Sequence, residues 1–206
     1  MTRLSEVETA APPHWDSMYH AGTPPWDTGQ PAPELIRVVE EGLLKPCPTL
    51  EIGCGTGADA IYLAQQGFEV TAVDSSPIAL ERARARREFG EEPGRFVLDD
   101  IFDFAPSAGA FEMVYDAGVY HFIRQTDLDR YLDLLWRITY PGSYCLALVG
   151  STGERASGGP PQVSKDEIYD ELGRLFDFVH LRRFMFESPV RKQGYKGWSC
   201  LMQRPA

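Results

Sequence analysis

The 206-residue chain is long enough for one domain with a sizeable core, and its 43% hydrophobic and 12% aromatic residues are typical of a globular protein. Its net charge of −10 argues against nucleic acid and anionic membrane surfaces as partners. The N-terminal residues lack the apolar core of a signal peptide, and no run of about 18 apolar residues predicts a membrane span, so we expect a cytoplasmic protein.

The cysteine pattern predicts free thiols and no metal site. The four cysteines show no C-x-x-C spacing, and no His-x-x-x-His pattern accompanies them as it would in a zinc site. Because their spacing is not that of a disulfide framework either, we expect reduced, buried thiols. These cysteines are Cys47, Cys54, Cys145 and Cys200.

Predicted strands and helices alternate along the chain. Apolar residues at helical spacing predict helices over residues 34–42, 58–67, 76–90, 125–139 and 165–176. Short apolar or β-branched runs predict strands over residues 49–53, 68–74, 95–100, 111–116 and 143–150. Residues 176–188 and 195–203 are predicted to form a β-hairpin. Thr126 is the expected cap of the fourth helix, and Ser164 with Glu167 forms the expected capping box of the fifth.

This alternation predicts an α/β fold. Strands separated by helices pair in parallel, with helices on both faces of the sheet. We therefore expect a doubly wound, mostly parallel seven-stranded sheet with the antiparallel hairpin at its edge.

Acidic residues follow the predicted strands. Glu51, Asp74, Asp100 and Asp116 each lie at or just after a strand end. Ligands of doubly wound sheets bind at the carboxyl ends of the strands. We therefore expect these carboxylates to line a ligand site.

The stretch TLEIGCGTGADA, residues 49–60, is a glycine loop between a strand and a helix. Such loops usually hold phosphate, but Glu51 at the mouth of this one disfavours a pyrophosphate. A ligand with a cationic group beside a carboxylate suits it better, and S-adenosylmethionine is such a ligand. Asp74 follows Gly57 by 17 residues, where a carboxylate can accept hydrogen bonds from two ribose hydroxyls.

The glycine loop and the acid of VTAVDSS together resemble the class I S-adenosylmethionine-dependent methyltransferases, over about residues 47–150. The resemblance implies a Rossmann-like fold. It assigns cofactor binding to the following residues: Glu51, Gly53, Gly55, Gly57, Asp74, Ser75, Asp100, Ile101, Phe102 and Asp116. Within this set Asp100 would face the adenine amino group, with Ile101 and Phe102 against the ring.

Two further stretches, PPWDTGQPAPEL and GGPPQVSKDEI, are similar to the thiopurine, thiol and halide methyltransferase branch, which includes tellurite-resistance-like enzymes. The resemblance implies one methyltransferase domain over residues 1–206, with residues 1–33 as a lid over the cofactor and 34–206 as the α/β core. Trp26 would then contact the cofactor, and Trp15 and Tyr19 the methyl acceptor. The alternative is that these three aromatic residues belong to the core.

The loop after the fourth strand, DAGVYHFI, is the expected acceptor side. Tyr120 and His121 are its candidate substrate-binding and catalytic residues, with His121 as a possible general base. The loop does not match the halide pattern, so the acceptor atom stays open among sulfur, selenium, nitrogen, oxygen and halide.

A basic run, Arg82, Arg84, Arg86 and Arg87, stands late in the third predicted helix. In an acidic chain we interpret it as a solvated helix face rather than a nucleic-acid site.

Three functions compete at this point. The first is methyl transfer from S-adenosylmethionine to a small molecule, with a thiol as the preferred acceptor and nitrogen or oxygen as alternatives. The second is a protein that binds the cofactor without transferring methyl. The third, a nicotinamide oxidoreductase, is disfavoured by Glu51 and by Ala58 in place of the last fingerprint glycine. The oligomeric state is left open.

Overall fold

The computed structural model describes residues 15–86, 94–153 and 159–206. In these residues seven strands form one sheet in the order β3-β2-β1-β4-β5-β7-β6. The strands are β1 (Pro48–Ile52), β2 (Glu69–Asp74), β3 (Gly94–Leu98), β4 (Met113–Ala117), β5 (Tyr144–Gly150), β6 (Asp177–Phe186) and β7 (Tyr195–Gln203). The first five pair in parallel, whereas β7 runs antiparallel to both β5 and β6. The predicted sheet and its antiparallel hairpin are therefore confirmed, with β6 as the outermost strand.

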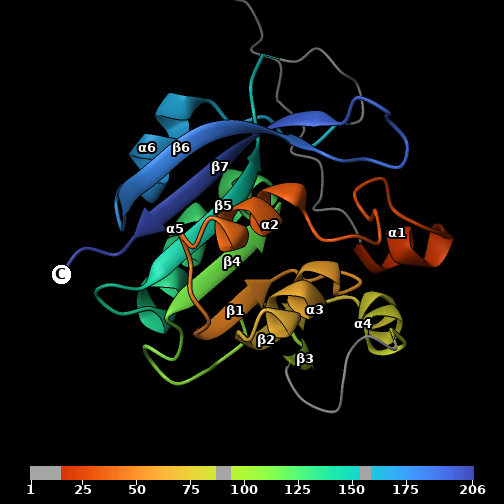
Figure 1. Ribbon diagram of the computed structural model, residues 1–206, viewed down its shortest axis with the longest axis horizontal. Helices are drawn as coiled ribbons and strands as arrows, with labels where there is room; N and C mark the ends of the chain where they lie inside the picture. The colour runs from red at the N-terminus through yellow and green to blue at the C-terminus, as the bar shows by residue number, and fades with distance from the viewer. Residues whose placement is uncertain (1–14, 87–93, 154–158) are drawn as a thin grey trace, which may run out of the picture.

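Helices cover both faces of the sheet (Figure 1). They are α1 (Trp15–Ala21), α2 (Pro33–Glu40), α3 (Ala58–Gln65), α4 (Pro77–Arg84), α5 (Tyr120–Ile138) and α6 (Lys165–Leu172). In the figure α2 and α3 lie in front of the sheet and α5 lies behind it, while α1 lies to one side, next to α4.

The two faces follow from side-chain alternation along each strand. On β5, Cys145, Ala147 and Val149 belong to one buried cluster, which also contains the apolar side of α5 and α6. Leu146 and Leu148 point the other way, into a cluster with α2, α3 and α4. Every second residue of a strand faces the same side, so a strand that is apolar throughout needs cover on both faces.

Several local signals are confirmed. Ser76 caps α4 by accepting a hydrogen bond from Ala79 N, and Pro77 stands at its first turn. Ser164 and Glu167 form the predicted capping box of α6. Among the described residues all four cysteines are free thiols, and only Cys47 is not fully buried.

Three element predictions are corrected. The fourth predicted helix begins earlier, at Tyr120, and Thr126 does not cap it, because its hydroxyl donates to Ile123 O at 3.3 Å. The predicted start falls instead at a kink, where Asp127 has the non-helical angles φ −136° and ψ 34°. In the proline-rich front segment, residues 15–33, for which the sequence predicts no helix or strand, α1 forms and buries Tyr19. The third predicted helix ends earlier than residue 90, at Arg84, and residues 87–90 of the prediction lie outside the described residues.

The strand order places the ligand site. The chain runs from β1 outward to β3 and then returns to place β4 on the other side of β1. At such a reversal the loops after the two central strands separate and leave room for a ligand. Glu51, Asp74 and Asp116 all lie at this carboxyl edge, and Ile52 pairs with Asp116 in register. Within the described ranges, no helix is long and apolar enough to cross a membrane.

Candidate active site

The glycine loop turns sharply from β1 into α3. Gly53, Gly55 and Gly57 have φ of 66°, 54° and 77°, the left-handed region that glycine adopts without a steric penalty. Gly53 N and Cys54 N both donate to Val73 O, which ties the loop to β2. A Cβ atom on Gly55 would lie 2.7 Å from the Tyr19 hydroxyl. Tyr19 of the front segment thus leaves no room for a side chain at Gly55.

Asp74 holds this loop in place from the end of β2. Its Oδ2 accepts a hydrogen bond from Gly55 N at 2.7 Å and its Oδ1 accepts one from Ser76 N at 2.8 Å. Burial raises the pKa of Asp74, and these backbone hydrogen bonds oppose that rise. Each carboxylate oxygen has a second lone pair, so both can also accept a ribose hydroxyl. Ser75, predicted beside it, is exposed.

Glu51 is buried without a counter-charge. The side chain is 3% exposed, and Oε2 has no hydrogen-bond partner among the described residues. Desolvation, with the negative charges of Asp59 and Asp74, raises its pKa well above the ordinary value. A buried carboxylate without a partner is costly, so this oxygen suits a cationic ligand group. Gly55 has no side chain, so a ligand can approach the loop backbone there. Together, Gly55 and the Glu51 oxygen fit the amino-acid part of S-adenosylmethionine.

Sequence reasoning missed Asp59 and Tyr115. Asp59 lies in the first turn of α3, where its Oδ1 accepts a hydrogen bond from Ala32 N at 2.6 Å and its Oδ2 one from Tyr115 OH at 2.8 Å. It therefore links the front segment to β4 beneath the glycine loop. An acidic residue directly after the loop, at the positive end of a helix, was the available signal.

The front segment places its aromatic residues over the loop. The Trp15 ring lies 5.6 Å from that of Trp26 and 4.8 Å from that of Phe122, both edge to face. Trp26 Nε1 donates to the Tyr19 hydroxyl at 3.2 Å. Tyr19 is buried, as the core alternative expects, whereas Trp26 is 41% exposed. The segment thus contributes both to the core and to the rim of the site.

Comparison with known proteins agrees with this site. Residues 49–142 match the methyltransferase domain family. A 2-heptyl-1-hydroxyquinolin-4(1H)-one methyltransferase of Mycobacteroides abscessus is 30% identical over 159 residues, 76% of this chain and 70% of that protein. The chain belongs to the class I S-adenosylmethionine-dependent methyltransferases. S-adenosylmethionine is accordingly its methyl donor.

Further comparisons specify the branch and the fold. A probable thiol methyltransferase 2 of Arabidopsis thaliana is 29% identical over 157 residues, 74% of this chain and 68% of that protein. This likeness places the enzyme in the predicted thiopurine, thiol and halide branch. A solved structure on the conversion of a disulfide bond into a thioacetal group during echinomycin biosynthesis aligns with a TM-score of 0.79 at 24% identity, covering 92% of this chain and 90% of that one.

The predicted adenine side of this methyltransferase follows β3. Asp100 is exposed, and its Oδ1 accepts a hydrogen bond from Phe102 N at 2.9 Å, so the side chain caps its own turn. Ile101 and Phe102 are half-buried against the core, and the Arg130 guanidinium lies 4.2 Å from the Phe102 ring centre. Adenine contact by these residues stays a prediction.

Asp116 binds groups of its own chain at the end of β4. Its carboxylate accepts hydrogen bonds from Val119 N at 2.7 Å, Tyr120 N at 2.9 Å and Tyr131 OH at 2.7 Å. Burial raises its pKa to about 6, although these bonds favour the charged form. The side chain therefore caps the start of α5, and its contact with the cofactor stays a prediction.

His121 lies in a position that does not favour a general base. It is 3% exposed, and its Nδ1 accepts a hydrogen bond from Gly150 N at 3.1 Å. Desolvation lowers its pKa to about 3, so the ring is neutral at physiological pH and carries its proton on Nε2. Tyr120 is buried, and its hydroxyl donates to the Glu171 carboxylate at 2.7 Å. Glu171 also pairs with Arg124.

In the basic run at the end of α4, Arg84 is exposed as predicted for a solvated face, whereas Arg82 and Arg86 are half-buried. Arg82 donates to the carbonyl oxygens of Tyr19 and Gly22, and Arg86 donates to those of Gly29 and Thr56. Arg84 donates to Phe96 O, and Arg87 lies outside the described residues.

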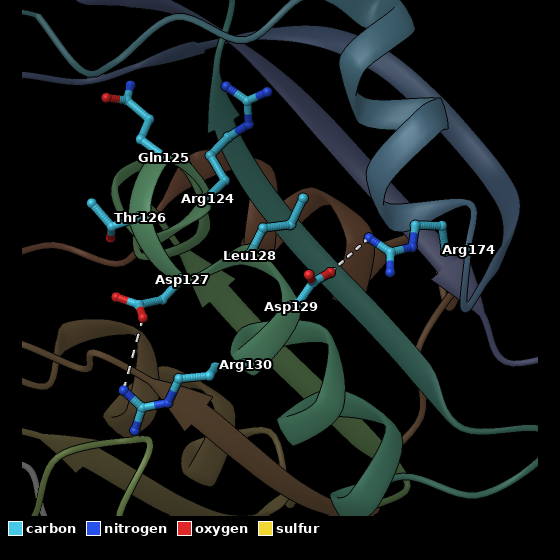
Figure 2. Close-up of a pocket in the computed structure, with 8 residues that line it drawn as sticks. All are labelled: Arg124, Gln125, Thr126, Asp127, Leu128, Asp129, Arg130 and Arg174. Atoms are coloured by element: carbon cyan, nitrogen blue, oxygen red, sulfur yellow. Dashed lines mark hydrogen bonds and ion pairs between the residues drawn. The ribbon is translucent and has the colours of Figure 1, made fainter.

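A hollow beside the kink of α5 is lined by paired charges (Figure 2). Asp127 pairs with Arg130 at 3.8 Å, and Asp129 pairs with Arg174 at 3.0 Å. Arg124, which also lines the hollow, pairs with Glu167 and Glu171, so every charge that lines it has a partner and we assign no ligand to it. The described residues hold no His, Cys, Asp or Glu cluster suited to a metal ion.

Glu51 should make cofactor binding pH-dependent. Because folding raises its pKa above 4.5, the protonated carboxyl stabilises the folded protein at low pH, and that stability is lost as the pH rises through the folded pKa. An ammonium group favours the charged form, so binding S-adenosylhomocysteine below this pKa should release a proton. Calorimetry in two buffers of different ionisation enthalpy measures that release.

Glu51→Gln should remove the proton release, weaken binding by about tenfold and stabilise the free protein at neutral pH. Glu69→Gln, an exposed glutamate on β2, is the matched control and should change none of these. Unchanged affinity and proton release in Glu51→Gln would contradict the role of Glu51.

Proposed function

We propose that this S-adenosylmethionine-dependent methyltransferase of small molecules acts on a thiol or a similar soft nucleophile. The observation that carries the proposal is the state of His121, the one histidine of the expected acceptor loop. Its pKa is lowered to about 3 and its Nδ1 is occupied by Gly150 N, so it accepts protons poorly. An acceptor that ionises readily does not need it.

The acceptor must ionise at little cost. A thiol with a reference pKa of about 8.5 is a few per cent thiolate at neutral pH, so deprotonation costs only about 2 kcal/mol. A phenol with a pKa of about 10, and still more an alcohol, requires a base. The relative from Arabidopsis thaliana, named a probable thiol methyltransferase, supports the same choice.

The chain's own contribution is then to bind, orient and exclude water. The bound cofactor supplies a methyl group already activated by a sulfonium charge. We propose that Glu51 and the glycine loop hold its amino-acid part and that Asp74 holds its ribose. The front segment, residues 15–33, would cover it and place Trp26 near the methyl donor and Trp15 and Tyr19 beside the acceptor. The acceptor must lie about 3–3.5 Å from the methyl carbon and in line with the leaving sulfur.

A second candidate is transfer to oxygen or nitrogen of a small metabolite. The Mycobacteroides abscessus relative is named for a hydroxyquinolinone, which favours this alternative. A panel of thiols, halides, amines, phenols and N-hydroxy heterocycles, scored by loss of cofactor, distinguishes the two.

On the best thiol we expect kcat/KM to rise with pH as the acceptor ionises. No inflection should occur near pH 6.5, because His121 stays neutral down to about pH 3. In His121→Ala, kcat/KM should fall by less than about 100-fold, which is the lower end of general-base effects. The proposal would be overturned if thiols were inert and the enzyme methylated a hydroxyl or an amine. A much larger loss of kcat/KM in His121→Ala on that substrate would then identify His121 as the base.

A further inference from the structure

Two arginines, Arg82 on α4 and Arg86 just beyond its C-terminal end, reach across to the front segment. Arg82 donates from Nη1 to Gly22 O at 2.9 Å and from Nη2 to Tyr19 O at 2.6 Å. Arg86, four residues later, donates from Nη1 to Gly29 O at 3.0 Å. The segment is thus held at both ends of the stretch that contains Trp26.

Arg86 also binds the glycine loop. Its Nε donates to Thr56 O at 2.8 Å, and its Nη2 to Thr56 Oγ1 at 3.2 Å. The same hydroxyl donates to Asp27 Oδ1 at 2.9 Å. Thr56 is therefore the junction at which α4, the glycine loop and the front segment meet.

The partners of these guanidinium groups are mostly backbone carbonyls. In residues 15–86, 94–153 and 159–206, neither Arg82 nor Arg86 forms an ion pair with a carboxylate. The planar fork of arginine can span two carbonyl oxygens at fixed geometry, which a lysine ammonium cannot reproduce. Such contacts fix the position of a segment while leaving it free to detach, because no buried charge pair has to be broken.

We propose that Arg82 and Arg86 are positioning residues that latch the front segment over the cofactor. The proposal rests on the proposed function of that segment as a cover. Neither arginine is bonded to Glu51 or Asp74, so both act through the segment: Arg82 holds α1, and Arg86 holds the Gly29 end against Thr56. The latch sets how long the cofactor stays bound and how well water is excluded from it.

Limited proteolysis by chymotrypsin tests the latch, because Trp15, Tyr19 and Trp26 are cleavage sites within the segment. In wild type, S-adenosylhomocysteine should slow cleavage at these sites. Arg82→Gln and Arg86→Gln should raise their cleavage rate about fivefold or more, with residues beyond 33 still protected. S-adenosylhomocysteine should dissociate about three- to tenfold faster from both variants.

Arg84→Gln is the matched control, since Arg84 stands between the two latch arginines, at the end of α4, and donates to Phe96 O on β3 instead. It should match wild type, and Arg82→Lys and Arg86→Lys should fall between wild type and the glutamine variants. If S-adenosylhomocysteine does not slow cleavage in wild type, the covering role itself fails. If it does, but both glutamine variants match wild type, or Arg84→Gln changes as much as they do, the latch is overturned.

Discussion

Gly55→Val should abolish most cofactor binding, lowering the affinity for S-adenosylhomocysteine by more than about 100-fold. The new side chain would begin 2.7 Å from the Tyr19 hydroxyl, at the place where the cofactor must approach the loop backbone. It would also force valine into a φ of 54°, which β-branched residues rarely adopt. Calorimetric titration measures the loss.

A second glycine variant controls for the effect of backbone strain alone. Gly42 has a φ of 69° with nothing within 4 Å of its added Cβ, so Gly42→Val carries similar strain without an obstruction. Both variants should lose stability by about 1–2 kcal/mol, but only Gly55→Val should lose affinity. Equal affinities in the two variants would show that the glycine is needed for folding rather than for binding.

Asp74→Ala should weaken S-adenosylhomocysteine binding by about 1.5–3 kcal/mol, the range for charge-assisted hydrogen bonds. The change removes the acceptor for the ribose hydroxyls and also releases Gly55 N and Ser76 N, so a simple loss does not separate the two effects.

A second ligand separates them. The 2′,3′-dideoxy analogue of S-adenosylhomocysteine lacks the ribose hydroxyls, so wild type should bind it more weakly than the parent compound, but more tightly than Asp74→Ala binds the parent, because the variant also loses its contacts with the loop. Asp74→Ala should discriminate little between the two ligands, because the losses are not additive when one contact is removed from both sides. If the losses of affinity from the variant and from the analogue were additive, or if Asp74→Ala kept wild-type affinity, Asp74 would not be the residue that binds the ribose.

The sequence predicted most of the fold because the fold depends on local patterns. Apolar runs without alternation identified strands covered on both faces, and the Ser164–Glu167 capping box identified the start of α6. The start of α5 was wrong because its cap is Asp116, a residue of the preceding strand that also binds Tyr131. A cap formed across a loop has no fixed spacing to recognise.

The site divides in the same way. By itself, the sequence determined the glycine loop, the acids Glu51 and Asp74 at the strand ends, and the class of ligand, because that chemistry depends on residue type at fixed spacing. Only the tertiary structure decided that His121 is buried against Gly150 N and that Arg82 and Arg86 hold the front segment. Their partners are backbone groups, which every residue carries, so such contacts leave no pattern in the sequence.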